Sequence, residues 1–187
     1  MLNETISKKC QQGVTLLEML ITLAIAAILL TVVAPNVQSI LTKNKITSEI
    51  NELSGLFQFA RFTAIDEQAL TVVCPSSNFD SCTTNWNDPK MVFIDDNNNG
   101  ARDAGEELLL VSQSISSTNT MTASEDIVQF LDSGGALTAA NIKLCPNSKD
   151  AKFARALEIT AQGRTRLSTD PENDGIHNDS SGNLSCS

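Results

Sequence analysis

Apolar and polar positions divide the chain into three parts, and the first part is an almost unbroken apolar run. Residues 14–34 carry a single charged side chain, Glu18. As an α-helix, a run of this length covers roughly 31 Å, which matches the hydrocarbon core of a bilayer. Lysines precede the run, and no basic residue follows it until Lys43. This charge pattern predicts a transmembrane helix that keeps residues 1–13 in the cytoplasm.

The second part, residues 35–68, is amphipathic. Beyond Pro35, apolar residues recur three or four positions apart, and polar residues fill the positions between them. This is the period of a helix with one apolar stripe, so we expect the helix to continue and to pack its stripe on a globular domain. The stripe consists of Ile46, Ile50, Leu53, Phe57, Ala60 and Ala64.

The third part, residues 69–187, alternates short apolar runs with turn residues. This pattern predicts a head of antiparallel β-strands packed against the helix, so the expected fold class is α+β. From Thr169 onward almost no apolar side chains occur, and only Cys186 is expected to fix this C-terminal tail. The predicted strands are 69–74, 90–95, 107–113, 126–131, 141–145, 155–160 and 163–168.

Composition and charge argue against two classes of function, general nucleic-acid binding and catalysis. The chain of 187 residues has 13 Lys and Arg against 22 Asp and Glu, a formal net charge of -9. Nucleic-acid binding over the whole surface is therefore not expected, because the polyanion would meet a net anion. The chain has one His, and it lacks a recognised nucleophile motif or a phosphate-binding glycine loop. We expect no enzymatic activity, and a role in assembly or binding instead.

Four of the five cysteines follow the apolar run, in a region rich in Asn, Ser and Thr. None shows C-x-x-C spacing, which argues against a zinc ribbon or a thioredoxin-type site. The four cysteines therefore predict two disulfides formed in an oxidising compartment. Four unrelated buried thiols are the alternative.

The segment KKCQQG-VTLLEMLITLAIAAILLTVVAP resembles a type IV prepilin leader and the helix that follows it. The resemblance implies that prepilin peptidase cuts after Gly13, which removes Cys10. Val14, at a position where Phe is usual, then becomes the N-methylated first residue. Glu18 is a costly charge in an apolar helix. The resemblance implies that it sets the register of assembly by pairing with a neighbouring N-terminus, and snorkelling to the head groups is the alternative.

The head is similar to minor pilins of the FimT, FimU and GspH type. It carries VVCPSSNFDSC, a following Asn-Trp, MVFIDDNNNG, a late hairpin with Gly-Arg-x-Arg, and a Cys close to the C-terminus. The layout of this family favours the pairs Cys74–Cys82 and Cys145–Cys186. The residues alone leave the other pairings open.

The Gly-Arg-x-Arg segment is the first candidate binding site. Arg164 and Arg166 lie two apart, so on a strand both guanidinium groups point to one face, where each can clamp a phosphate. In FimT-like pilins this motif is associated with DNA binding, so the resemblance implies duplex DNA as a partner. Lys149, Lys152 and Arg155 belong to the same basic stretch. Pairing of the arginines with surface carboxylates, or contact with a neighbouring subunit, is the alternative.

Residues 95–106 are the second candidate site. They match the calcium-loop pattern D-x-[DN]-x-[DN]-G-x5-E, whose alternating oxygen ligands suit a hard cation. Because the flanking segments are predicted strands, a plain hairpin turn without metal is the alternative. The candidate ligands are Asp95, Asn97, Asn99 and Glu106.

Together with the resemblance, these features imply a minor type IV pilin that enters the pilus as a tip or priming subunit. The implied partners are other major and minor pilins or pseudopilins, prepilin peptidase, the inner membrane and duplex DNA. The expected location is the inner membrane, single-pass with the head in the periplasm, and then a filament at the cell surface. A GspH-like pseudopilin of type II secretion and a membrane-anchored binding protein of the envelope are the alternatives.

Overall fold

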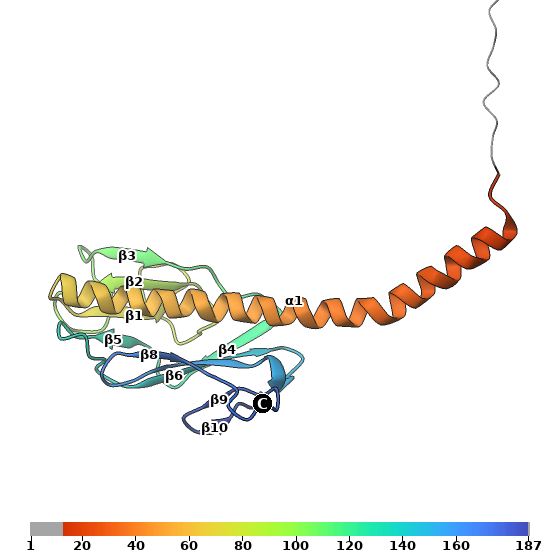
Figure 1. Ribbon diagram of the computed structural model, residues 1–187. Coiled ribbons are helices and arrows are strands. Elements are labelled where there is room, and N and C mark those ends of the chain that lie inside the picture. Colours follow the sequence, from red (N-terminus) through yellow and green to blue (C-terminus); the bar gives the residue numbers. More distant parts are fainter. Residues whose placement is uncertain (1–12, 187) are drawn as a thin grey trace, which may run out of the picture. The chain divides into compact units, whose positions relative to one another are not determined.

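The computed structural model describes residues 13–186, apart from the side chains of residues 32–36 (Figure 1). The contacts between residues divide the chain into two compact units, Met1–Leu41 and Thr42–Ser187. The second unit contains both sheets and its own apolar core.

Helix α1 (Leu16–Asp66) begins in the first unit and ends in the second. It starts where Thr15 can cap it, because the Thr15 hydroxyl accepts a hydrogen bond from the Glu18 N–H at 3.2 Å. The apolar run and the amphipathic segment are thus parts of one helix, as the sequence predicted from the apolar run and from the helical spacing that follows it.

Within the residues whose side chains are described, no helix combines the length and the apolar character needed to cross a membrane. The predicted transmembrane segment, residues 14–34, extends into residues 32–34, which lie outside those residues. The predicted leader also lies outside the described part of the chain, except for Gly13.

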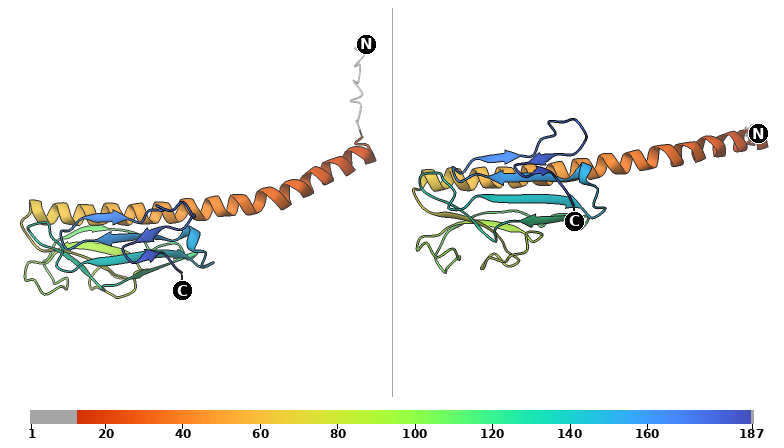
Figure 2. Two further views of the ribbon diagram at one scale, coloured as in Figure 1. Left: turned by 60° about the horizontal axis from the view of Figure 1, so that its bottom comes forward. Right: turned by 90° about the horizontal axis from the view of Figure 1, so that it is seen from below.

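The described part of the second unit contains two four-stranded antiparallel sheets beside α1 (Figures 1 and 2). Sheet A has the order β3-β2-β1-β5, and sheet B has the order β4-β6-β7-β8. The strands of sheet A are β1 (Thr71–Pro75), β2 (Lys90–Ile94), β3 (Leu108–Val111) and β5 (Val128–Phe130). Sheet B and the remaining short elements comprise β4 (Asn119–Ala123), β6 (Ala140–Pro146), η1 (Ala151–Phe153), β7 (Arg155–Ile159), β8 (Thr165–Leu167), β9 (Asn178–Asp179) and β10 (Gly182–Asn183).

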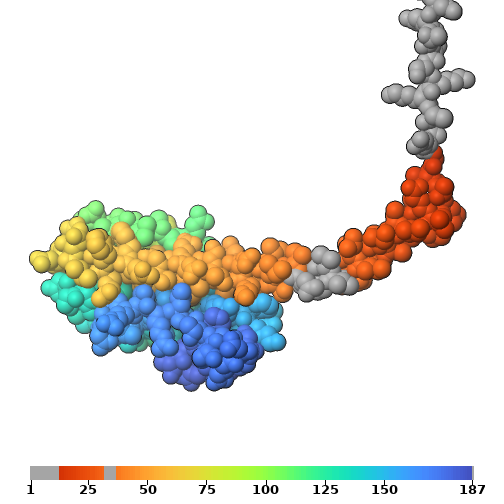
Figure 3. Space-filling model, viewed as in Figure 1, coloured from red at the N-terminus to blue at the C-terminus, as the bar shows by residue number. Residues whose placement is uncertain are grey.

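The apolar stripe of α1 is buried against both sheets. Each predicted stripe residue from Ile46 to Ala64 is at most 4% exposed and packs in one core with side chains from both sheets. The Phe57 ring stacks on Trp86, with centroids 6.2 Å apart, and meets Phe130 edge-on at 6.3 Å. The other side of this part of the helix is uncovered (Figure 3). The predicted α+β class is confirmed.

The prediction that only Cys186 fixes the C-terminal tail is wrong. Leu184 is 4% exposed and packs against Ala154 and Ala156 on the side of sheet B that faces away from α1. The short hairpin of β9 and β10 lies against the same side (Figure 1). Ile176 and Leu184 are eight residues apart in a polar run and produce no period, so the sequence pattern did not indicate this contact.

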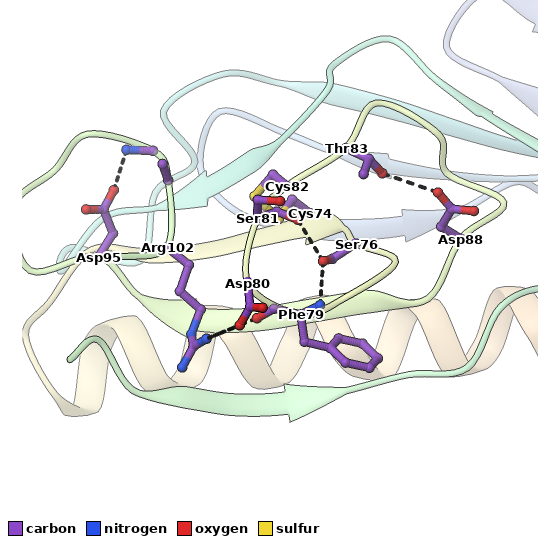
Figure 4. Close-up of a disulfide and its surroundings, with 12 residues drawn as sticks. Cys74, Ser76, Phe79, Asp80, Ser81, Cys82, Thr83, Asp88, Asp95 and Arg102 are labelled. Atoms are coloured by element: carbon purple, nitrogen blue, oxygen red, sulfur yellow. Dashed lines mark hydrogen bonds and ion pairs between the residues drawn. A yellow bond between two sulfur atoms is a disulfide. The ribbon is translucent and has the colours of Figure 1, made fainter. Parts of the chain in front are cut away.

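Both predicted disulfide pairs are confirmed. Cys74 bonds to Cys82, and Cys145 bonds to Cys186. The first bond closes a loop over the side of sheet A that faces away from α1, and the second holds the tail on sheet B. Figure 4 shows the first bond and its surroundings.

Candidate functional site

The first unit presents an uncovered apolar surface. The described large apolar side chains from Val14 to Leu41 are at least 45% exposed. Glu18 lies among them and is exposed as well, and no ion pair within the described residues involves it. An apolar surface of this extent marks contact with a membrane or with other proteins.

The predicted Gly-Arg-x-Arg hairpin forms the turn between β7 and β8. Gly163 has a φ of 72°, and a Cβ on it would collide with the carbonyl oxygen of Gly134. The Gly163 N–H donates to the Thr160 carbonyl at 2.7 Å, which closes the turn. The turn therefore requires a glycine at position 163 whether or not the motif binds a ligand.

Arg61 of α1 holds this turn in place, and sequence reasoning did not find it. Its Nε donates to the Gly134 carbonyl at 2.8 Å, and a terminal nitrogen donates to the Gln162 carbonyl at 3.5 Å. One helix side chain thus joins the turn before β6 to the turn before β8. Its position on α1, four residues after the buried Phe57, gave no signal of this role.

Arg164 and Arg166 are both exposed, at the start of β8 on the edge of sheet B. Arg166 lies in β8 and Arg164 directly precedes this strand. The shared face of the two guanidinium groups therefore stays a prediction from their two-residue spacing. Arg166 lies opposite Glu158 in the ladder, but the Glu158 carboxylate accepts from the Ser180 N–H at 2.7 Å. Among the described residues neither arginine forms an ion pair, so both remain available to a ligand.

Lys149, Lys152 and Arg155 lie at the opposite end of sheet B from Arg164. Arg155 begins β7 and Arg164 follows its end, so the five residues between Arg155 and the turn separate the two groups by roughly 17 Å. Adjacent strands reverse direction, and this reversal splits a basic stretch that is continuous in sequence. The structure therefore leaves the two hairpin arginines at the β7–β8 turn and places the other three basic residues toward the other end of sheet B.

Arg155 is committed to the protein itself. Its guanidinium donates to the carbonyls of Lys152 at 3.2 Å and Ala154 at 2.6 Å. Burial lowers its pKa, and the nearby Asp170 carboxylate partly offsets that effect. Arg155 is thus a poor candidate for a phosphate contact, in contrast to the exposed Lys149 and Lys152.

The predicted calcium loop closes on itself. Asp95 accepts hydrogen bonds from the N–H groups of Asn99 (3.1 Å) and Gly100 (2.7 Å). Glu106 accepts from the N–H groups of Asp96 (3.0 Å) and Asp103 (2.8 Å). No group of three or more His, Cys, Asp and Glu among the described residues is placed to hold a metal ion. The loop is thus closed by its own hydrogen bonds in this structure, and the calcium site stays a prediction.

Asn97 and Asn99, the remaining candidate ligands, also serve the turn. Both side-chain amides donate to Asp103 at 2.7 Å. Arg102 in the same loop donates to the Phe79 carbonyl at 3.0 Å and lies 3.9 Å from Asp80, which joins this loop to the disulfide loop (Figure 4).

Lys90 is a second residue that sequence reasoning missed. It begins β2 beneath α1 and is only 2% exposed. Burial lowers the pKa of its ammonium group to about 8, and the carboxylates of Glu52, Glu49 and Asp88 partly offset that effect. The only signal in the sequence was a lysine placed directly before an apolar strand.

Two family models match the chain. The model described as type II transport protein GspH covers residues 49–163, and the prokaryotic N-terminal methylation motif covers residues 8–34. The first match contains α1 from Glu49 onward and the strands as far as the β7–β8 turn, and the second contains the apolar run. No curated protein matches the chain.

Solved structures share the fold. The type IV minor pilin FimU of Pseudomonas aeruginosa is 19% identical, covers 77% of this chain and 96% of its own, and has a TM-score of 0.58. The minor pseudopilin EpsH of the type 2 secretion system of Vibrio cholerae is 10% identical, covers 69% of this chain and 99% of its own, and has a TM-score of 0.50. At these identities the likeness concerns the fold alone.

Proposed function

We propose, from the premise that the chain belongs to the family of the type II transport protein GspH, that it is a minor pilin which enters a type IV pilus as a tip or priming subunit. Its role is assembly, and the head and the first unit have separate tasks in it. The head supplies a folded, disulfide-stabilised body, and the first unit supplies the surface that joins other subunits.

The observation that carries this proposal is the uncovered apolar surface of the first unit, which begins at Val14. In the inner membrane, with the head in the periplasm, lipid covers this surface. In a filament at the cell surface, the helices of other major and minor pilins or pseudopilins cover it. Both environments remove apolar area from water, so transfer from one to the other does not expose it.

Processing prepares the helix for this transfer. Prepilin peptidase cleaves between Gly13 and Val14, and Val14 becomes the N-methylated terminus. Glu18 lies one helical turn from that terminus and pairs with the terminal amine of a neighbouring subunit. A carboxylate in an apolar surrounding is costly unless paired, so this pairing favours one register of assembly.

Mass spectrometry of filaments sheared from cells tests the proposal. We expect a peptide that begins with methylated Val14, at low abundance relative to the major subunit. Deletion of the gene that encodes the chain then separates two functions found in the family. Loss of pili supports a priming subunit, whereas loss of protein secretion with normal pili supports a GspH-like pseudopilin. A chain with an intact Met1 that never enters filaments contradicts both and favours a membrane-anchored binding protein.

The exposed pair of Arg164 and Arg166 favours a second role, the binding of duplex DNA for uptake. Two guanidinium groups on one strand face, without ion pairs among the described residues, can each contact a backbone phosphate. Such contacts carry no sequence preference. The net charge of -9 opposes them, so the binding should be weak and should fall steeply with salt.

Fluorescence anisotropy with the unit Thr42–Ser187 and a short duplex at about 20 mM salt tests this role. Changing Arg164→Gln together with Arg166→Gln should lower the slope of log K against log salt by roughly 1.8, since each lost contact accounts for about 0.9. The pair Lys43→Gln with Lys45→Gln removes the same charge from two exposed lysines on α1 and should change the slope much less. Equal binding by the arginine double variant would contradict the proposed DNA site.

A further inference from the structure

A pocket of about 200 Å³ lies between β4 and β6 on the side of sheet B that faces away from α1. Ile142 and Leu144 of β6 point into the core, so the alternation of the strand turns Lys143 outward. Lys143 lies opposite Thr122 in the β4–β6 ladder, and both line the pocket together with Thr120, Lys149 and the Cys145–Cys186 disulfide.

The lining is cationic although the chain as a whole is anionic. Among the described residues, two ammonium groups and no Asp or Glu border the pocket. The Lys143 Nζ donates one hydrogen bond to the Ser185 carbonyl at 2.7 Å, which fixes its position and leaves two N–H donors for a ligand. Lys149 is exposed, and its ammonium group has no partner among the described residues.

The walls of the pocket are rigid. The disulfide joins its floor to the tail, and the Thr120 hydroxyl donates to the Asn147 side-chain carbonyl at 2.9 Å. Lys149 is held at a φ of 60° by a hydrogen bond from its N–H to the Pro146 carbonyl at 2.9 Å. This backbone region suits Gly or Asn better than Lys, so Lys149 adopts it at a conformational cost. The backbone conformation therefore gives no reason for a lysine at this position.

From this arrangement we propose that the pocket binds a phosphate-type oxyanion. The Lys143 ammonium, held by the Ser185 carbonyl, the Lys149 ammonium and two threonine hydroxyls border one small concave site. Charge-assisted hydrogen bonds to an oxyanion are about twice as strong as neutral ones. Among the described residues no side-chain carboxylate lines the pocket, so the usual competitor for such cations is missing from its described lining. A phosphate group accepts several hydrogen bonds at once, which suits this set of donors better than a planar carboxylate.

This site goes beyond the proposed filament and DNA roles, because it uses different residues from the Arg164–Arg166 pair. Lys143 and Arg166 lie on the same side of sheet B, two strands and two residues apart, which corresponds to roughly 12 Å between their Cα atoms. The phosphate can belong to a nucleic-acid backbone or to a small free phosphate. The two sources offer the same chemistry to the pocket and are separated by experiment.

Calorimetric titration of the full chain in detergent with inorganic phosphate, at constant ionic strength, tests the proposal. We expect binding that Lys149→Gln weakens by at least about fivefold, since one of two ammonium groups is lost. Lys152→Gln is the matched control: this lysine is also exposed, lies three residues further on and does not line the pocket. It should weaken binding less than about twofold. Thr122→Val, which preserves shape, supplies an independent second variant.

Three results would overturn the proposal: no heat of phosphate binding by the wild-type chain, equal loss in the two lysine variants, or equally tight binding of acetate. The double variant Arg164→Gln, Arg166→Gln should bind inorganic phosphate like the wild type, which keeps this site distinct from the DNA proposal. If a short duplex displaces phosphate from that double variant, the pocket takes backbone phosphates. If it does not, the pocket takes a free phosphate, and the site stands in either case.

Discussion

At the scale of single residues, Lys90 places a charged group in a buried position, where loss of hydration disfavours the charge. It begins β2 beneath α1, and burial lowers its pKa from 10.5 to about 8. At neutral pH the group still carries its proton, with Glu52, Glu49 and Asp88 as the charges that face it. The folded state therefore bears a desolvation cost that an apolar residue of similar length would avoid.

This placement predicts that the second unit becomes more stable as the pH rises from about 8 to 10.5. Over that range the unfolded chain keeps the Lys90 proton while the folded chain has released it, so the free energy of unfolding rises with pH. The total gain should reach roughly 3 kcal/mol. Urea unfolding of Thr42–Ser187 at several pH values measures it, and the chain has 0 Tyr to titrate in the same range.

Lys90→Met is the matched variant for this measurement. It should be at least as stable as the wild type at pH 7 and should lack the alkaline rise, because it has no proton to release. A rise of the same size in the variant would show that other groups cause it.

Two glycines predict opposite effects of the same substitution. Gly163→Ala should destabilise the second unit by about 1–3 kcal/mol, because φ is positive there and the new Cβ meets the Gly134 carbonyl and Arg61. Gly55→Ala should stabilise it by about 0.5–1 kcal/mol, because Gly55 lies in the interior of α1 and nothing lies within 4 Å of the new Cβ. Thermal unfolding of both variants measures the difference, and equal shifts would contradict the turn geometry.

At the scale of elements, the two disulfides should contribute unequally to stability. In the chain-entropy model, the sequence separations of 8 and 41 residues correspond to about 2.5 kcal/mol for Cys74–Cys82 and about 4 kcal/mol for Cys145–Cys186. Replacing both cysteines of a pair by serine should therefore lower the urea midpoint more for the second pair. The reverse order would mean that the Cys74–Cys82 bond contributes more to the free energy of unfolding than the length of its loop implies.

The elements also show how far the sequence could be interpreted. The period of α1 and the apolar runs of β1, β2, β6 and β7 are strong signals, so these elements lie where the pattern predicted them. Strand β4, with the sequence NTMTA, was missed because Met121 is its only large apolar residue. The basic stretch was split because strand reversal, which depends on pairing between distant residues, decides which cations become neighbours.

The candidate sites also divide into features that the local sequence predicts and features that depend on residues far away in sequence. The shared face of Arg164 and Arg166 follows from alternation along a strand, which is a local property, and it stays a prediction because Arg164 precedes β8. The roles of Arg61 and Lys143 could not be predicted, since each depends on a carbonyl that lies far away in sequence, at Gly134 and Ser185. The calcium pattern does not separate its two interpretations, because the same spacing of Asp, Asn and Gly also closes a turn by hydrogen bonds alone.

At the scale of the whole molecule, Glu18 is where the first unit should affect assembly without affecting folding. It is exposed and lies in a different unit from the head, so Glu18→Ala should leave the head stable and the chain abundant in the membrane. The variant should nevertheless enter filaments poorly, because it lacks the charge that pairs with a neighbouring terminus. Immunoblots of sheared filaments and of membranes measure the two amounts, with Glu18→Asp as the control that keeps the charge. Normal filament content of the alanine variant would indicate that Glu18 only reaches toward the head groups.

The packing of Trp86 has a spectroscopic consequence. It is the only tryptophan in the chain, and its ring is 3% exposed against Phe57 of α1, while its Nε1 donates to the Glu125 carbonyl at 2.9 Å. The near-ultraviolet emission of the protein therefore comes from one indole at the seam between helix and sheets, without a tyrosine background. Any separation of α1 from the head lets water reach that ring and shifts its emission to longer wavelength. The protein thus contains an intrinsic optical reporter of helix docking, which can be followed in micelles, in vesicles and in assembled filaments without a label.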